Sequence, residues 1–106
     1  MAMIISTTDT VPGKEVHEIL GIVEGNSVKT KGLGKDFRAV GRSMAGGDMP
    51  YYAELMEQSR QAAMALMIKQ AQEMKADAII CVRYQSAAVM AGAAEVLAYG
   101  TAVRLR

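Results

Sequence analysis

A long helical pattern, Pro50 to Lys75, constrains the fold of this 106-residue chain more than any other feature. Apolar and small residues recur along it at spacings of three and four, which places them on one stripe of an α-helix. Pro50 falls in the first turn, where its missing N–H costs nothing, and Asp48 or Met49 takes the N-cap position. Such a helix is about 39 Å long. The predicted stripe consists of Tyr52, Leu55, Met56, Ser59, Ala63, Leu66, Met67 and Met74.

The segments around this helix are short, rich in β-forming residues and bounded by turn residues, so they predict strands. Residues 87–93, which include Gly92, predict a loop between the last two strands. One long helix on a small sheet indicates an α+β fold: a two-layer β-α-β-β sandwich, ending in an antiparallel hairpin. Residues 1–106 form a single domain. The predicted elements are strands at Met3–Ser6, Glu15–Gly25, Ala76–Ser86 and Ala94–Arg106, and a short helix at Lys35–Ser43.

The predicted strands and helix carry more apolar surface than one chain can bury. A sheet covered on one face should alternate apolar and polar residues, because its other face meets water. The last strand instead has Leu97, Tyr99 and Val103 on one side and Val96 and Ala98 on the other. A monomer would leave a large apolar patch exposed, and the simplest partner is another copy in closed symmetry. We therefore expect a homo-oligomer, with Met64, Ile68, Leu97 and Tyr99 at the interface.

Composition limits the class of protein. The formal net charge of +1 argues against nucleic acid as a partner, and 51% hydrophobic residues with 22% charged indicate a globular chain. The single cysteine fits a reducing compartment. No stretch resembles a signal peptide or approaches the ~20 apolar residues of a membrane span, so we expect a cytoplasmic protein without a membrane partner.

Several motifs resemble those of the YbjQ-like family, in the same order and over nearly the whole chain. They are "TTDTVPG" near the start, "GIVEGN", "GGDMPYYAEL" at the helix start, and "AYGTAV" near the end. The resemblance implies a dodecin-like subunit, assembly into ring-shaped pentamers and an unknown function, often labelled heavy-metal-binding. This sequence departs from the family pattern at Lys75, where relatives usually have glycine, which alters the helix stop but not the fold.

A metal site has few candidate ligands. Soft metals are usually bound by paired Cys, or by Cys and His at close spacing, and the sequence has no C-x-x-C motif. Cys81 and His17 are the only thiol and imidazole, and they lie on different predicted strands. The simpler interpretation makes Cys81 a core residue and His17 a surface or interface residue. An oligomer could still bring copies of either residue together around an axis.

A basic run could bind an anionic ligand, although a solvated face is the simpler interpretation. Lys35, Arg38 and Arg42 would share one face of the predicted short helix. The neighbouring glycines do not form a P-loop, because Asp36 follows Lys35 where Ser or Thr is required. Gly46 and Gly47 are better explained as a hinge at the start of the long helix.

No pattern indicates catalysis. The sequence lacks a Ser-His-Asp arrangement and an H-E-x-x-H motif, since His17 begins "HEILG". We therefore expect a protein that is not an enzyme and needs no cofactor, a metal being the one exception left open. Two hypotheses stay open. The first is a non-enzymatic oligomeric domain of unknown cellular role, either a scaffold or a binder of a small ligand at its subunit junctions. The second is a metal-binding protein whose site is assembled across subunits.

Overall fold

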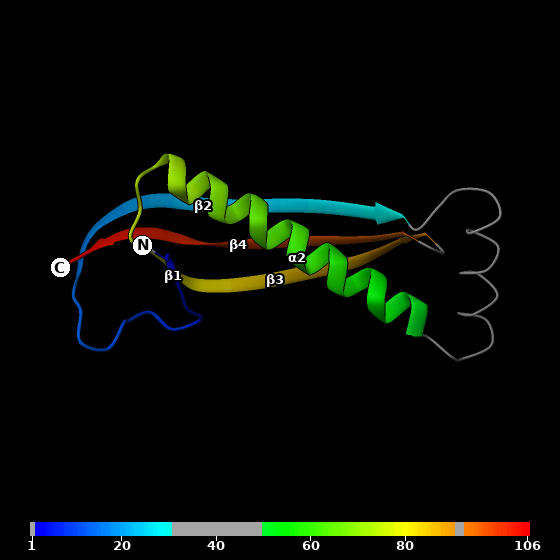
Figure 1. The fold of residues 1–106 in the computed structure, drawn as a ribbon, viewed down its shortest axis with the longest axis horizontal. Helices are drawn as coiled ribbons and strands as arrows, with labels where there is room; N and C mark the ends of the chain where they lie inside the picture. The colour runs from blue at the N-terminus through cyan, green and yellow to red at the C-terminus, as the bar shows by residue number, and fades with distance from the viewer. Residues whose placement is uncertain (1, 31–49, 91–92) are drawn as a thin grey trace.

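The computed structural model describes residues 2–30, 50–90 and 93–106 as one long helix lying across a sheet (Figure 1). The expected α+β class and its two layers are confirmed. The predicted short helix at residues 35–43 lies outside the described residues. In chain order the elements are β1 (Ile4–Ile5), β2 (Val16–Thr30), α2 (Pro50–Glu73), β3 (Ala78–Met90) and β4 (Ala93–Leu105).

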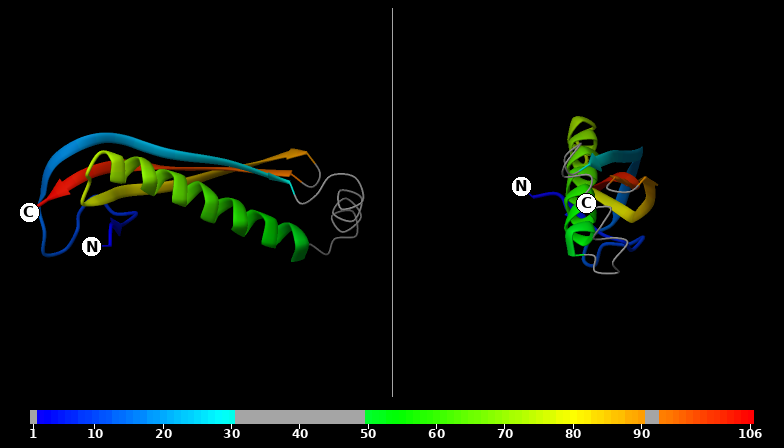
Figure 2. Two further views of the ribbon diagram at one scale, coloured as in Figure 1. Left: turned by 45° about the horizontal axis from the view of Figure 1, so that its top comes forward. Right: turned by 90° about the vertical axis from the view of Figure 1, so that its right-hand side faces the viewer.

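The sheet has the strand order β1-β3-β4-β2, so β4 is central and β2 forms one edge. β4 pairs antiparallel with both β3 and β2, which confirms the predicted hairpin, and β1 pairs parallel with β3. α2 covers one face of this sheet, and the segment that leads from β1 to β2 bends around one end (Figure 2). The other face of the sheet is called the open face below.

Two predicted strand ends were wrong, because glycine and alanine there did not stop the strands. β3 continues to Met90 and β4 starts at Ala93, so most of the predicted loop at residues 87–93 is strand. β2 continues to Thr30 instead of ending at Gly25. Gly25 lies inside this strand, opposite Ala98 of β4, and its role is to let α2 approach rather than to end the strand.

Small residues line the contact between α2 and the sheet. A Cβ added to Gly25 would lie 2.1 Å from the carbonyl oxygen of Ala63 and 2.7 Å from the nitrogen of Met67. Ala98 and Ala102 of β4 are fully buried on the same face. Since no side chain separates Gly25 from the helix backbone, α2 packs unusually close to β2.

The buried stripe of α2 has a spacing of four throughout. Four residues turn an α-helix by about 400°, so this stripe winds slowly around the helix, which crosses the strands obliquely. Its fully or almost fully buried members are Leu55, Ser59, Ala63, Met67 and Ala71.

The predicted stripe was correct for the first four of these residues, but it included two residues that are exposed. Leu66 is 47% exposed and Met74 is 37% exposed. A spacing of three moves a residue off this winding line, which is why Leu66 is displaced from the stripe, and the prediction omitted Ala71.

The N-terminal segment covers one end of the open face. Val11 packs there with Ala78, Ile80 and Val103 in a second small core. The backbone of the segment also pairs with β3, because Cys81 N–H donates to Thr8 O at 3.0 Å and Val82 N–H donates to Ser6 O at 3.0 Å. Cys81 has a φ of 55°, at an irregularity in the pairing of β3 with β4. This end of the open face is therefore closed by the chain itself.

The helix ends in a Schellman-type turn without glycine. Ala76 N–H donates to Ala71 O at 3.1 Å, and Lys75 N–H donates to Gln72 O at 3.0 Å. The turn needs a left-handed residue, and Lys75 adopts it with a φ of 63°. The helix therefore stops in the usual geometry, with a side chain where most proteins place glycine.

Candidate functional site

The two candidate metal ligands lie on strands that do not touch. β4 separates β2, which carries His17, from β3, which carries Cys81. Two strand spacings amount to about 9.5 Å, and the pairing registers add roughly 13 Å along the sheet. The imidazole of His17 is exposed, whereas Cys81 is half-buried against the second core. A metal site that uses both residues therefore requires more than one chain.

Among the described residues, no group of three or more His, Cys, Asp or Glu side chains is arranged to hold a metal ion. The basic residues Lys35, Arg38 and Arg42 lie outside the described residues, so the predicted anion site stays a prediction. Within the described part of the chain, no helix is long and apolar enough to span a bilayer.

The four predicted interface residues fall on two different surfaces. Met64 and Ile68 are half-buried in a groove between α2 and β3. Leu97 and Tyr99 lie on the open face, because they pair with residues of β2 whose side chains point away from α2. Both are half-buried. The structure therefore divides the predicted interface between the groove and the open face of the sheet.

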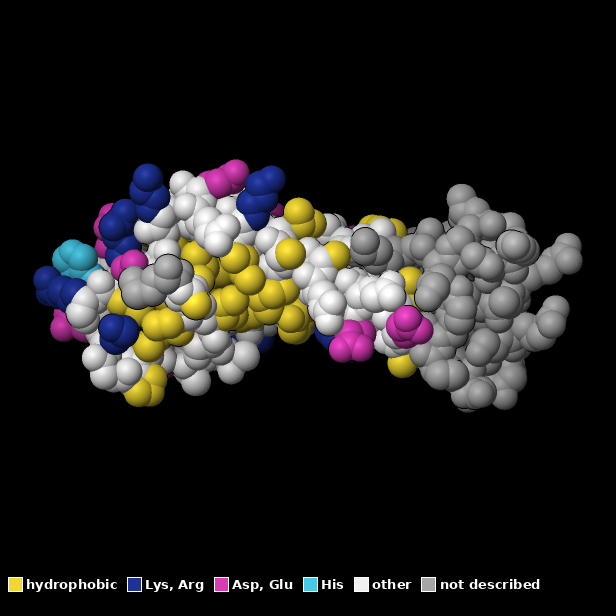
Figure 3. All heavy atoms as spheres, viewed as in Figure 1, with side chains coloured by type: hydrophobic (Ala, Val, Ile, Leu, Met, Phe, Trp, Pro, Cys, Tyr) yellow, Lys and Arg dark blue, Asp and Glu magenta, His cyan; other side chains and the backbone are white. Residues whose placement is uncertain are grey.

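The groove has a volume of about 340 Å³ and an apolar floor. Tyr84 of β3, 47% exposed, faces Met64 and Ile68 across it. Glu57 and Arg60 lie at its margin. On the side of α2, apolar side chains also form a continuous patch on the half of the molecule near the termini, with charged groups around it (Figure 3).

The open face carries large apolar residues that the prediction missed. Ile22 is 74% exposed, Ile19 is 69% exposed and Val28 is 58% exposed, all on β2. Their partners on β4 are Thr101, Val103 and Glu95, which share that face. The signal was present in the sequence as β-branched residues on both sides of one strand, but it did not show which side α2 would cover.

The edge at β2 is only partly protected. Glu24 N–H donates to the side-chain oxygen of Gln70 at 2.8 Å, so this backbone group points away from β4 and is satisfied by α2. At the other edge of the sheet β1 pairs with Ala78 and Ile79, and the segment after β1 bonds to Cys81 and Val82. Among the described residues, β2 and the part of β3 beyond Val82 thus leave backbone available for pairing with another strand.

Sequence comparison finds relatives that match nearly the whole chain. A family model described as "Putative heavy-metal-binding" matches residues 3–106. A protein from Thermosipho melanesiensis called UPF0145 protein is 52% identical over 103 residues, which cover 97% of this chain and 95% of that protein. UPF0145 proteins from Archaeoglobus fulgidus and Thermus thermophilus are 51% and 47% identical, covering 98% and 99% of this chain and 96% and 92% of theirs.

A solved structure shares the fold at low sequence identity. It is a protein with unknown function from Pediococcus pentosaceus, described as belonging to the DUF74 family, with a TM-score of 0.61. It is 19% identical, and the match covers 98% of each chain. The likeness therefore extends over the whole of both chains.

Proposed function

This chain belongs to the YbjQ family of UPF0145 proteins, and we propose that it works as a homo-oligomer, with no catalytic role of its own, in the cytoplasm. Its copies would form a ring of five, as the resemblance implies. The junctions between subunits would bind a small ligand. The observation that carries the proposal is the exposure of large apolar side chains on the open face of the sheet, with Ile22 at 74%.

The surface and shape of the chain support the proposal. Its accessible surface is 6647 Å², compared with roughly 5,700 Å² for a compact monomer of 11.3 kDa. Its radius of gyration is 16.8 Å, whereas about 13 Å is usual for a compact domain of this length. An elongated subunit with surplus surface is typical of chains that complete their packing with other copies.

The unlike edges of the sheet favour head-to-tail contacts. The outer edge of β2 on one copy can pair with the edge of β3 on the next, beyond Val82, the last residue to which the N-terminal segment bonds. A contact between two different surfaces generates a ring when the rotation closes. Such pairing would also bring the groove beside β3 close to the neighbouring copy.

Light scattering after gel filtration tests the assembly. We expect the wild-type chain to elute at a mass near five times 11.3 kDa. Ile22→Lys should lower this mass if the open face is the contact, and Tyr84→Lys should lower it if the groove is. Lys69→Glu changes the charge of another exposed residue and serves as the control. A folded wild-type monomer at micromolar concentration would contradict the proposal.

The family description favours a second candidate, a metal site assembled across subunits. His17 is exposed and available to a neighbouring copy, and Cys81 is half-buried. Isothermal titration with zinc, copper(I) and cadmium should give stoichiometric binding that Cys81→Ser or His17→Ala abolishes. Equal binding by the wild-type chain and both variants would remove these residues from consideration.

A further inference from the structure

A cavity of about 370 Å³ lies at the end of the sheet that carries the termini. This volume falls in the range of small-molecule sites, which is about 300–1,000 Å³. Its lining is mainly apolar and includes Met3, Ile4, Ala76 and Leu105. These residues come from the N-terminal segment, the connection after α2 and the end of β4, so three separate parts of the chain enclose one space.

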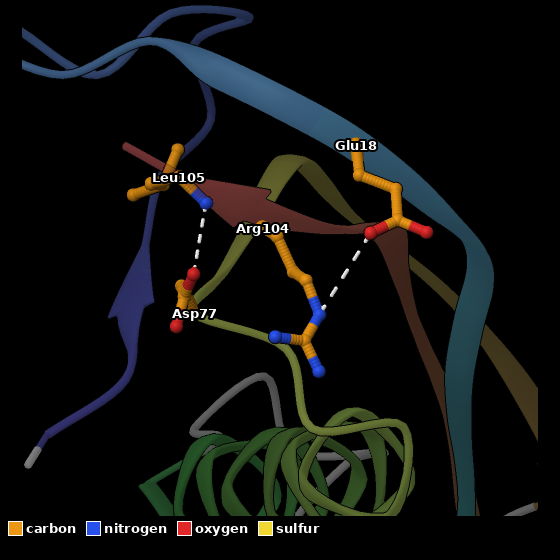
Figure 4. A network of polar contacts seen from close by, with 4 residues as sticks. All are labelled: Glu18, Asp77, Arg104 and Leu105. Carbon is orange, nitrogen blue, oxygen red and sulfur yellow. Dashed lines mark hydrogen bonds and ion pairs between the residues drawn. The ribbon is translucent and has the colours of Figure 1, made fainter.

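Hydrogen bonds fix the walls of this cavity. Asp77 joins three segments: its N–H donates to Val103 O at 2.9 Å, and its carbonyl oxygen accepts from Ile4 N–H at 3.4 Å. Its Oδ2 accepts from Leu105 N–H at 2.8 Å, a bond that Figure 4 shows. The walls are therefore held in place before any ligand arrives, which lowers the cost of ordering on binding.

Two basic residues belong to the lining of the site. Glu15 and Arg106 exchange both backbone hydrogen bonds, at 2.9 and 3.0 Å, which holds the segment that carries Lys14 against the end of β4. Lys14 and Arg106 both line the cavity. Arg106 is only weakly engaged, with one guanidinium nitrogen 3.4 Å from Glu15 Oε1. Lys14 has no side-chain partner among the residues described, so both can bind a carboxylate.

An anionic pole comes from a different element. Asp77 uses Oδ2 for Leu105, and its second carboxylate oxygen has no partner within the described chain. The last turn of α2 also lines the cavity through Gln72, and the C-terminal end of a helix favours positive charge. In the described ranges, Asp77 forms no ion pair with Lys14 or Arg106, so the two poles do not neutralise each other.

We propose that this cavity binds a small apolar α-amino acid. The carboxylate would lie at Lys14 and Arg106, the ammonium group at Asp77 and the end of α2, and the apolar side chain over Met3, Ile4 and Leu105. A mainly apolar lining that also includes two basic residues and one acidic residue matches a zwitterion better than a simple anion or cation. The site lies within one chain, so it does not depend on the proposed self-assembly.

Three probes of matching shape test the assignment: L-leucine, 4-methylpentanoate and 3-methylbutylamine. They are titrated into the ¹⁵N-labelled full chain, and amide shifts are followed by NMR. L-leucine should cause saturable shifts at Ile4, Ala76 and Leu105. Each probe with a single charge should bind about tenfold more weakly, because it loses one charge-assisted contact.

Two variants test whether Lys14 contacts the carboxylate of the bound amino acid. Lys14→Gln should weaken L-leucine about tenfold and leave 3-methylbutylamine unchanged, since only the carboxylate contact is lost. Lys69→Gln, at an exposed position of α2 outside the cavity, should change neither. The proposal is overturned if L-leucine gives no saturable shifts at the cavity, if either single-charge probe binds as tightly, or if Lys14→Gln has no effect.

Discussion

The two faces of the sheet differ in how fully one chain covers them. Under α2 the small residues Gly25, Ala98 and Ala102 are buried together with Val23 and Val96. On the open face Ile19 and Ile22 are about 70% exposed, at 69% and 74%. One chain therefore covers the face under α2 but leaves large apolar residues of the open face exposed, and such a group of residues is typical of a contact surface.

The small residues under α2 have a geometric role. Without a Cβ on Gly25, the backbone of α2 at Ala63 and Met67 rests directly on β2. Close approach fixes the position of the helix more tightly than layers of long side chains would. The covered face is therefore a rigid contact within one chain, whereas the open face is an adaptable surface for contacts outside it.

The strongest test of the covered face is Gly25→Ala. The added Cβ would lie 2.1 Å from a backbone oxygen that no side-chain rotation can move, so we expect a loss of about 3 kcal/mol in the free energy of unfolding. Gly100→Ala is the matched control. A Cβ there would lie 2.8 Å from Ile79 Cγ2 and 3.0 Å from the carbonyl oxygen of Ile80, both longer than the 2.1 Å contact at Gly25, so the loss should be smaller. Equal losses of unfolding free energy in urea denaturation would contradict the close packing of α2 on Gly25.

Ile22→Ala tests the open face in the same assay. If another copy covers this residue, the variant should lose about 1–2 kcal/mol per chain, and the loss should grow as the protein concentration rises. Lys69→Ala, at another exposed position, should have almost no effect. A thermal midpoint that is independent of concentration in both proteins would show that the open face simply meets water.

The smallest effect is expected from Ser59→Ala. The hydroxyl of Ser59 lies on the buried stripe of α2 and has no hydrogen-bond partner among the described residues. Removing it should stabilise the chain by about 1 kcal/mol in thermal denaturation. Ala63→Ser, one turn along the same stripe, makes the reverse change and should destabilise. Stabilisation by both variants would show that the contact between α2 and the sheet tolerates polar groups.

Much of the fold could be predicted from local patterns. The start of α2 at Pro50, the antiparallel hairpin and the layer order followed from periodicity and turn residues. The helix stop was harder to place, because Lys75 occupies a left-handed position that the sequence does not mark with glycine. The strand ends at Thr30 and Met90 were missed, since glycine and alanine act there as packing residues instead of terminators.

The candidate sites were less predictable. Sequence spacing showed that His17 and Cys81 lie on different strands, but not that β4 separates them. The cavity at Asp77 could not be foreseen, because its lining comes from positions far apart in the chain, such as Lys14 and Leu105. No local pattern links residues that meet only when β4 returns beside the N-terminal segment.

The sequence by itself determined the elements and their surplus of apolar surface, because periodicity and residue type act over a few neighbouring positions. Only the tertiary structure decided which face α2 covers, and hence that Gly25 is buried while Ile22 is exposed. It also decided that Lys14, Asp77 and Arg106 line one cavity. Both outcomes depend on strand register and helix crossing, which are set by packing between distant segments and leave no mark on neighbouring residues.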